Sequence, residues 1–178
     1  MKHLRLCAKH GALTLIVAAA CVALLHSYKA TASDDNPGFG QGASYLTTTT
    51  ETNGGFPTRS VITLHADHTM STVDADSGGP TYYFTGEFGS WRPDGKGGAV
   101  GRTLDFALYP HYLYPNGDVA RVDYTISFQD DGPLSRIVGT ETITIFPLRS
   151  NPFGSGGTNL GTFNFTGQLI TPGTLSRP

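Results

Sequence analysis

Cysteine is missing from most of this chain. The 178-residue sequence contains Cys7 and Cys21 only, and both precede Ala32. The rest of the chain therefore offers no disulfide, no thiol nucleophile and no thiolate ligand for a metal ion. About 146 residues follow Ala32, and a domain of that size buries a core without such cross-links.

Acidic residues are absent from the same N-terminal stretch, which has the composition of a secretory signal peptide. Three bases precede an apolar run over 11–25, which is shorter than the roughly 20 residues of a membrane-spanning helix. The small-residue signature Ala-Thr-Ala then ends at Ala32, where a signal peptidase would cut. We expect 1–32 to be a signal peptide cleaved near Ala32, which makes the protein secreted or periplasmic. Retention of this segment as an N-terminal anchor is the alternative.

Positive charge is scarce once this segment is removed. Four of the 12 lysines and arginines lie before Ala32, whereas all 14 acidic residues lie after it, which gives the mature chain a formal charge of −6 with histidine neutral. No lysine or arginine cluster remains to attract phosphates or anionic lipid. We therefore expect no nucleic-acid partner and no membrane association after cleavage.

Helical patterns are lacking as well. A polar lead-in at 33–42 is rich in glycine and proline, and beyond it no long stretch free of these residues has apolar side chains at i, i+3 and i+4. Short β-branched and aromatic runs alternate with turn residues instead, a pattern typical of many antiparallel strands. The expected strands are Ser44–Thr52, Ser60–Leu64, Thr69–Asp74, Tyr82–Phe88, Ser90–Arg92, Ala99–Leu108, Val119–Phe128, Leu134–Phe146 and Gly161–Ile170.

Turn residues separate these runs. Pro93-Asp94-Gly95 and Pro115-Asn116-Gly117 combine the fixed φ of proline with a glycine that accepts positive φ. Asp67-His68 makes a less comfortable turn, because histidine tolerates positive φ less readily than glycine. Closing about eight strands joined in this way removes their exposed edges. We predict an all-β, antiparallel up-and-down barrel of about eight strands over 43–172, with a tail at 173–178.

Diagnostic catalytic motifs are absent. The sequence has no G-x-S-x-G, no H-E-x-x-H, no phosphate-binding glycine loop and no Cys/His pair, so no cofactor or metal site is predicted. Glu141 stands out because it shares its strand parity with Ile143 and Ile145. A carboxyl group on an apolar face has a raised pKa, which a general acid or base requires. The alternatives are that the threonine face points inward, or that an arginine pairs with Glu141.

A second candidate catalytic group lies on the hairpin that turns at 115–117. Asp105, Arg121 and Asp123 are expected on a common face, where Arg121 would bridge two carboxylates. On the outside of the barrel this would be a solvated charge cluster that contributes little stability. Inside the lumen it would form a polar floor for a ligand.

Aromatic side chains indicate where a ligand would enter. Tyr112 and Tyr114 lie on an aromatic excursion, where they either line a mouth or simply pack over the barrel end. The candidate ligand-binding residues are Phe84, Trp91, Tyr112, Tyr114 and Tyr124. Trp91 is the only tryptophan, and we expect it to anchor the core or plug the barrel, with Arg92 stacked over its ring.

Three segments are suggestive in combination: Ser60-Val61-Ile62-Thr63-Leu64-His65-Ala66-Asp67-His68-Thr69, Gly89-Ser90-Trp91-Arg92-Pro93-Asp94-Gly95 and Arg121-Val122-Asp123-Tyr124. Together they resemble a group of secreted small barrels of the calycin or allene-oxide-cyclase-like type. The resemblance covers roughly Ser44–Ile170, and its motifs specify turns and packing. Related barrels include ligand carriers and cyclases that fold a flexible substrate inside an apolar lumen. No catalytic residue is carried over, because fold likeness alone does not define an activity.

Three functions remain open from the sequence. The favoured one is binding of a small hydrophobic ligand at the barrel mouth, because an exported protein fits a cytoplasmic biosynthetic role poorly. The second is a cyclase or isomerase that uses Glu141 or the Asp105/Arg121 pair. The third is a structural or surface interaction module with a packed interior. Whether the protein is an enzyme is therefore left open.

Overall fold

The structure is a computed structural model, and it describes residues 42–51, 58–75, 84–107, 113–129 and 135–171. These residues belong to one compact unit, Asn36–Pro178. The expected signal peptide at 1–32, residues 33–41 of the expected lead-in, Tyr112 and the expected tail at 173–178 lie outside the described residues. Within the described ranges, no helix has the length and hydropathy that crossing a bilayer requires.

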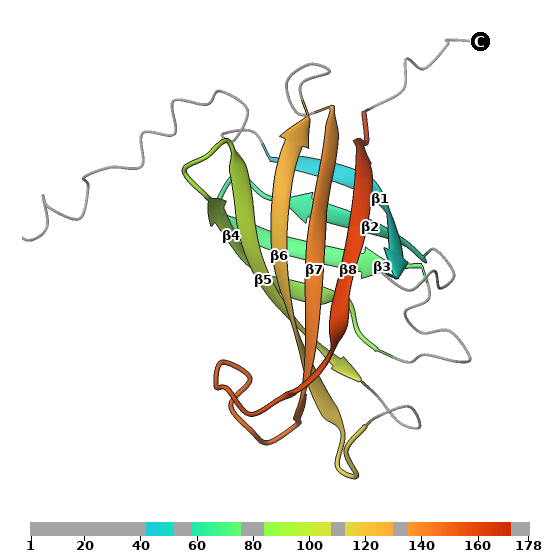
Figure 1. Cartoon of the computed structure of the whole chain (residues 1–178), viewed down its shortest axis with the longest axis vertical. Coiled ribbons are helices and arrows are strands. Elements are labelled where there is room, and N and C mark those ends of the chain that lie inside the picture. Colours follow the sequence, from blue (N-terminus) through green and yellow to red (C-terminus); the bar gives the residue numbers. More distant parts are fainter. Residues whose placement is uncertain (1–41, 52–57, 76–83, 108–112, 130–134, 172–178) are drawn as a thin grey trace, which may run out of the picture. The chain divides into compact units, whose positions relative to one another are not determined.

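Eight antiparallel strands follow one another around a closed barrel in sequence order (Figure 1). They are β1 Ala43–Glu51, β2 Thr58–Leu64, β3 Thr69–Asp74, β4 Glu87–Pro93, β5 Gly98–Ala107, β6 Asp118–Gln129, β7 Arg136–Pro147 and β8 Thr158–Leu169. The barrel closes where β1 pairs with β8, from Tyr45 opposite Leu169 to Glu51 opposite Phe163. The predicted all-β, up-and-down barrel is therefore confirmed, and its closure leaves no open sheet edge.

One part of the strand prediction is wrong. The sequence indicates separate strands over Tyr82–Phe88 and Ser90–Arg92, whereas the structure has the single strand β4. Gly89 separates the two runs in the sequence, yet it remains within the strand. A Cβ atom there would lie 1.9 Å from the carbonyl oxygen of Arg102 on β5. This glycine therefore permits a close approach of two backbones and does not end the strand.

Strand alternation directs one set of side chains into the barrel. The apolar part of this interior consists of Tyr45, Ile62, Leu64, Met70, Trp91, Ala99, Val122, Tyr124, Ile126, Ile137 and Phe165. Burying a large apolar side chain contributes about 1.5–3 kcal/mol. In a barrel without disulfides, this cluster and the strand pairing are what stabilise the fold.

Trp91 anchors the core beneath the turn between β2 and β3. Its exposed fraction is 4%, and its indole Nε1 donates a hydrogen bond to the carbonyl oxygen of His65 at 3.0 Å. The expected stacking of Arg92 over this ring is wrong. His68 takes that place, with ring centroids 5.0 Å apart and an interplanar angle of 8°. The backbone of His68 has the positive φ, +67°, that the sequence marked as uncomfortable.

Candidate functional site

The polar part of the barrel interior is the candidate functional site. The inward-facing polar residues in the described ranges include Thr47, Thr49, Ser60, Thr72, Asp74, Glu87, Thr103, Asp105, Asp118, Tyr124 and Glu141. Strand register explains why they meet, because Tyr45, Ile62, Thr72 and Glu87 are successive partners across β1 to β4. Side chains in such a row lie on the same face of the sheet.

Glu87 is the centre of a buried hydrogen-bond network. The hydroxyl of Thr103 donates to Glu87 Oε2 at 2.5 Å, and the hydroxyl of Tyr124 donates to the same oxygen at 2.6 Å. Tyr124 also lies 3.4 Å from the hydroxyl of Thr72. Burial, and then the charge of Asp74, raise the pKa of Glu87 to about 8, against the opposing effect of the two donors. Glu87 is therefore mostly protonated at neutral pH.

Glu141 and Asp105 face the same lumen. Burial, followed by the charge of Asp74, raises the pKa of each to about 7. A hydrogen bond with Thr49 opposes this for Glu141, and one from the backbone of Ala120 opposes it for Asp105. Glu141 faces inward with its strand neighbour Ile143, which packs against the core cluster, as its parity predicted. Both carboxyl groups are thus poised between charged and neutral forms near physiological pH.

Tyr45 places an unpartnered hydroxyl inside the barrel. The side chain is fully buried, at 0% exposure, and its hydroxyl has no hydrogen-bond partner in the described part of the chain. Burial raises the pKa of this hydroxyl to about 12, so it remains neutral. A buried hydroxyl without a partner costs about 1–3 kcal/mol. A polar group that entered the lumen would relieve this cost.

The expected common face of Asp105, Arg121 and Asp123 is wrong. In the β5–β6 hairpin Asp105 pairs with Ala120, whereas Arg121 pairs with Leu104. Asp105 therefore points into the barrel, and Arg121 and Asp123 point out of it. The register of the hairpin places Asp105 and Arg121 on opposite faces of the sheet, because the face of a side chain changes with each residue along a strand.

Arg121 secures the connection between β7 and β8 on the outer surface. Its Nη1 donates to the carbonyl oxygens of Pro152 at 2.9 Å and Gly154 at 3.2 Å. The guanidinium carbon lies 5.1 Å from the ring centroid of Phe146, and Nε lies 3.0 Å from an oxygen of Asp123. These contacts give Arg121 a structural position and no access to the lumen.

The predicted aromatic residues do not meet at one mouth. Trp91 lies near the β4–β5 turn, whereas Tyr114 lies in the β5–β6 turn, at the opposite end of the barrel. Tyr114 instead shares a hydrogen bond of 2.8 Å with the hydroxyl of Thr158. Phe84 forms an isolated bridge to Ala107. Tyr124 alone among the described candidates belongs to the polar interior.

Several residues of the site were missed by sequence reasoning, chiefly Glu87, Asp74, Thr103 and Tyr45. Glu87 alternates with Phe84 and Phe88 in a way that suggests a solvent-facing position, and Phe88 is in fact the outward residue, at 69% exposure. Parity alone was misleading here, because the face that carries Phe88 is the outer one and the face that carries Glu87 is the inner one. Asp74 and Ser60, whose hydroxyl hydrogen-bonds the Asp74 carboxylate, are brought together only by the β2–β3 register.

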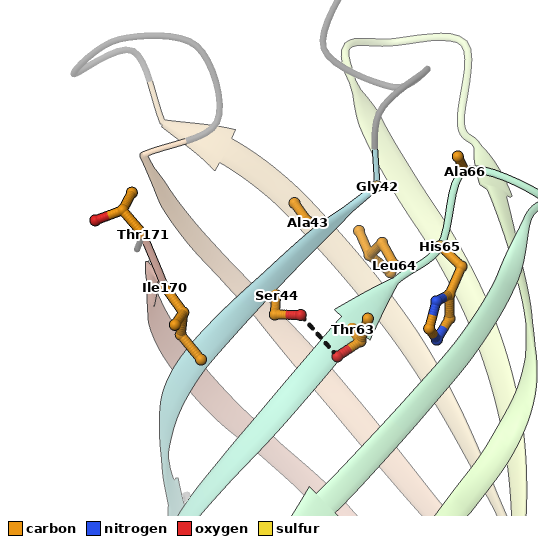
Figure 2. A pocket seen from close by; sticks show the side chains of 9 residues that line it. All are labelled: Gly42, Ala43, Ser44, Thr63, Leu64, His65, Ala66, Ile170 and Thr171. Carbon is orange, nitrogen blue, oxygen red and sulfur yellow. Dashed lines mark hydrogen bonds between the residues drawn. The ribbon is translucent and has the colours of Figure 1, made fainter. Parts of the chain in front are cut away.

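An open depression of about 530 Å³ lies where β1 begins and β2 ends (Figure 2). The hydroxyls of Ser44 and Thr63 line it and share a hydrogen bond of 3.0 Å. His65 is the single ionisable side chain of its lining, and none of the inward carboxyl groups borders it. We therefore place the candidate site in the lumen. In the described part of the chain, no three histidine or acidic residues are arranged to hold a metal ion.

In comparisons with protein-family models, curated proteins and solved structures, nothing matches this chain. The architecture, an eight-stranded, antiparallel, closed barrel, is established by the strand pairing of the structure itself.

Proposed function

We propose that this protein is an exported barrel that binds one small amphipathic molecule inside its lumen. The supporting observation is the inner wall itself: an apolar cluster continues into a polar row that contains the unpartnered hydroxyl of Tyr45. Ligand pockets combine apolar lining with a few convergent polar groups in this way. Glu141 and Ile143 face inward and stay partly exposed, which supports access from solvent. The calycin-like resemblance of the sequence is in keeping with a carrier role.

The first test is binding of the neutral fluorescent probe N-phenyl-1-naphthylamine. Its fluorescence should rise on entry into an apolar lumen and saturate at one probe per chain. Ile143→Trp fills the lumen and should abolish this signal, whereas Thr142→Trp places the same bulk on the outer face and should preserve it. If Ile143→Trp does not fold, Tyr45→Phe provides the second variant, because it changes the inner wall without adding volume.

Native mass spectrometry of protein purified from its own host would identify a retained ligand. A chain that binds neither the probe nor any host molecule, and whose Tm does not respond to a lipid and terpenoid panel, would be a structural or interaction module instead.

A second candidate function is a barrel cyclase or isomerase of the allene-oxide-cyclase-like type. The observation that favours it is the placement of Glu87, Asp105 and Glu141 in one lumen with pKa values near neutrality, as proton transfer requires. A retained ligand incubated in deuterated water should then exchange carbon-bound hydrogen, and Glu141→Gln should stop the exchange. Binding without exchange would leave the carrier function alone.

A further inference from the structure

The described lysines and arginines lie on the outside of the barrel, whereas carboxyl groups lie on both sides of its wall. Among the described residues, the carboxyl groups on the inner face are those of Asp74, Glu87, Asp105, Asp118 and Glu141. None of the described lysines and arginines is buried; these are Arg59, Arg92, Lys96, Arg102, Arg121, Arg136 and Arg149. Asp105 and Glu141, with pKa values of about 7, are partly ionised near neutral pH, and no described base shares their face, so the lumen has a negative electrostatic potential.

On the outer surface, arginines neutralise Asp123. Asp123, the neighbour of Tyr124 on β6, pairs with Arg102 at 2.5 Å and with Arg121 at 3.0 Å. Within the described ranges, no ion pair of this kind is found for Glu87, Asp105 or Glu141, although Glu87 and Asp105 are only 5% and 6% exposed. Attraction between opposite charges is stronger in the interior of the barrel than at its surface, because the effective dielectric constant of the interior is lower.

Aromatic rings and the free hydroxyl complete a binding environment of definite chemistry. The rings of Tyr124 and Phe165 meet edge to face at 6.2 Å between centroids, inside the same lumen. Tyr45 lies in the row that leads through Ile62 and Thr72 to Glu87, and its unpartnered hydroxyl can accept a hydrogen bond. An ammonium group finds carboxyl oxygens, a hydroxyl acceptor and aromatic faces in such a site.

We propose that the ligand of this lumen carries a protonated amine on a compact apolar body. This inference rests on the proposed binding function and specifies its ligand class. The ammonium lies among Glu87, Asp105 and Glu141, and the apolar body packs against the core cluster. A neutral alcohol of the same shape gains only hydrogen bonds, and a carboxylate is repelled by the acidic wall.

Proton linkage gives this ligand class a signature of its own. A cation beside Asp105 and Glu141 favours their charged forms and lowers their pKa values from about 7, so that amine binding near neutral pH releases protons. A neutral ligand has the opposite effect, since further desolvation of the carboxyl groups promotes proton uptake.

Isothermal titration calorimetry with three isosteric probes tests the proposal: 2-phenylethylamine, 2-phenylethanol and phenylacetate. At about pH 7.5, we expect the amine to bind at least about tenfold more tightly than the alcohol, and phenylacetate not to bind. Titrations in phosphate and in Tris, whose ionisation enthalpies differ, should show proton release with the amine.

The double variant Asp105→Asn/Glu141→Gln should reduce the preference for the amine to within about threefold of the alcohol. Asp123→Asn, which removes one acid from the outer face, is the matched control and should retain the preference. Equal affinity for alcohol and amine, or proton uptake with the amine, overturns the inference and leaves the proposed binding function intact. Absence of binding by all three probes also overturns it, and the N-phenyl-1-naphthylamine experiment then decides the binding function separately.

Discussion

At the scale of single residues, the lumen is defined by hydrogen bonds that converge on one carboxyl oxygen. Tyr124 and Thr103 both donate to Glu87 Oε2, which leaves Oε1 to carry the acidic proton. Both donors are neutral hydroxyl groups. They hold the carboxyl group of Glu87 in place without a positive charge, and Glu87 stays predominantly neutral at pH 7. This arrangement lets a buried acid persist without a cationic partner.

Tyr124→Phe tests this network. Removing the hydroxyl should reduce the free energy of unfolding by about 1 kcal/mol near pH 6 and by up to about 3 kcal/mol near pH 9, because the lost bond is to a charged group once Glu87 ionises. Urea unfolding at the two pH values measures this difference. Tyr114→Phe removes an exposed hydroxyl bond to Thr158 and should cost little at either pH. A cost for Tyr124→Phe that does not depend on pH would argue against the titration of Glu87 in this network.

At the scale of elements, one arginine holds a long connection against the sheet. Arg121 contacts two carbonyl oxygens of the β7–β8 connection and the ring of Phe146. The sequence marked Arg121 as a candidate catalytic residue, but the hairpin register gives it this outer role.

Arg121→Ala should therefore destabilise the fold by about 1–3 kcal/mol and expose 150–157 to proteases, while binding of the lumen probe is retained. Denaturant unfolding and limited proteolysis measure the two effects. Arg102→Ala is the matched control, because Arg102 pairs with the same Asp123 but is exposed, and such pairs contribute at most about 1 kcal/mol. Loss of probe binding in Arg121→Ala with an intact fold would restore Arg121 as a residue of the site.

Close contact between neighbouring strands depends on the absence of a side chain at Gly139 on β7. A Cβ atom at Gly139 would lie 2.2 Å from the carbonyl oxygen of Thr125 and 2.5 Å from the ring of Phe165. Gly139→Ala should therefore cost about 3 kcal/mol or prevent folding. Gly86→Ala, whose nearest neighbour would be 3.5 Å away, should cost less than about 1 kcal/mol. Thermal unfolding of the two variants checks this ranking.

At the scale of the whole molecule, the acidic lumen determines how stability depends on pH. Glu87, Asp105 and Glu141 hold their protons more tightly in the folded chain than in the unfolded chain, because burial raises their pKa values. Between about pH 5 and pH 8 the folded state therefore binds more protons, and the free energy of unfolding decreases as the pH rises. Asp67 and Asp94 have pKa values lowered by hydrogen bonds to Thr69 and Lys96, so their opposite effect is confined to pH values below about 4.

We expect the Tm to fall by at least roughly 10 °C from about pH 5 to pH 8, since each pKa unit corresponds to about 1.4 kcal/mol and each kcal/mol to about 2–4 °C in a domain of this size. Thermal unfolding followed by circular dichroism measures this trend. The Asp105→Asn/Glu141→Gln variant should flatten the profile, whereas Asp123→Asn should keep its slope. A Tm that increases over this interval would contradict the burial of the three acids in neutral form.

The sequence by itself determined the class of fold. Alternation of side chains along a strand involves only neighbouring residues, so it can be recognised in the sequence. The same holds for turn residues such as Gly95 and Gly117, which have φ of +75° and +91°. The parity that Glu141 shares with Ile143 was legible for the same reason, whereas the choice between this face and the threonine face as the inner one was left open.

Only the tertiary structure decided which carboxyl groups share the lumen. It also decided that Arg121 lies on the outer face, away from these carboxyl groups. Register sets the face of a side chain, and a shift of one residue reverses it; the pairing of Asp105 with Ala120 is not encoded in either strand separately. Closure of the barrel then placed Glu87 on β4 within hydrogen-bond distance of Tyr124 on β6. The acidic, amine-selective character proposed for the site therefore depends on contacts between strands that are distant in the sequence.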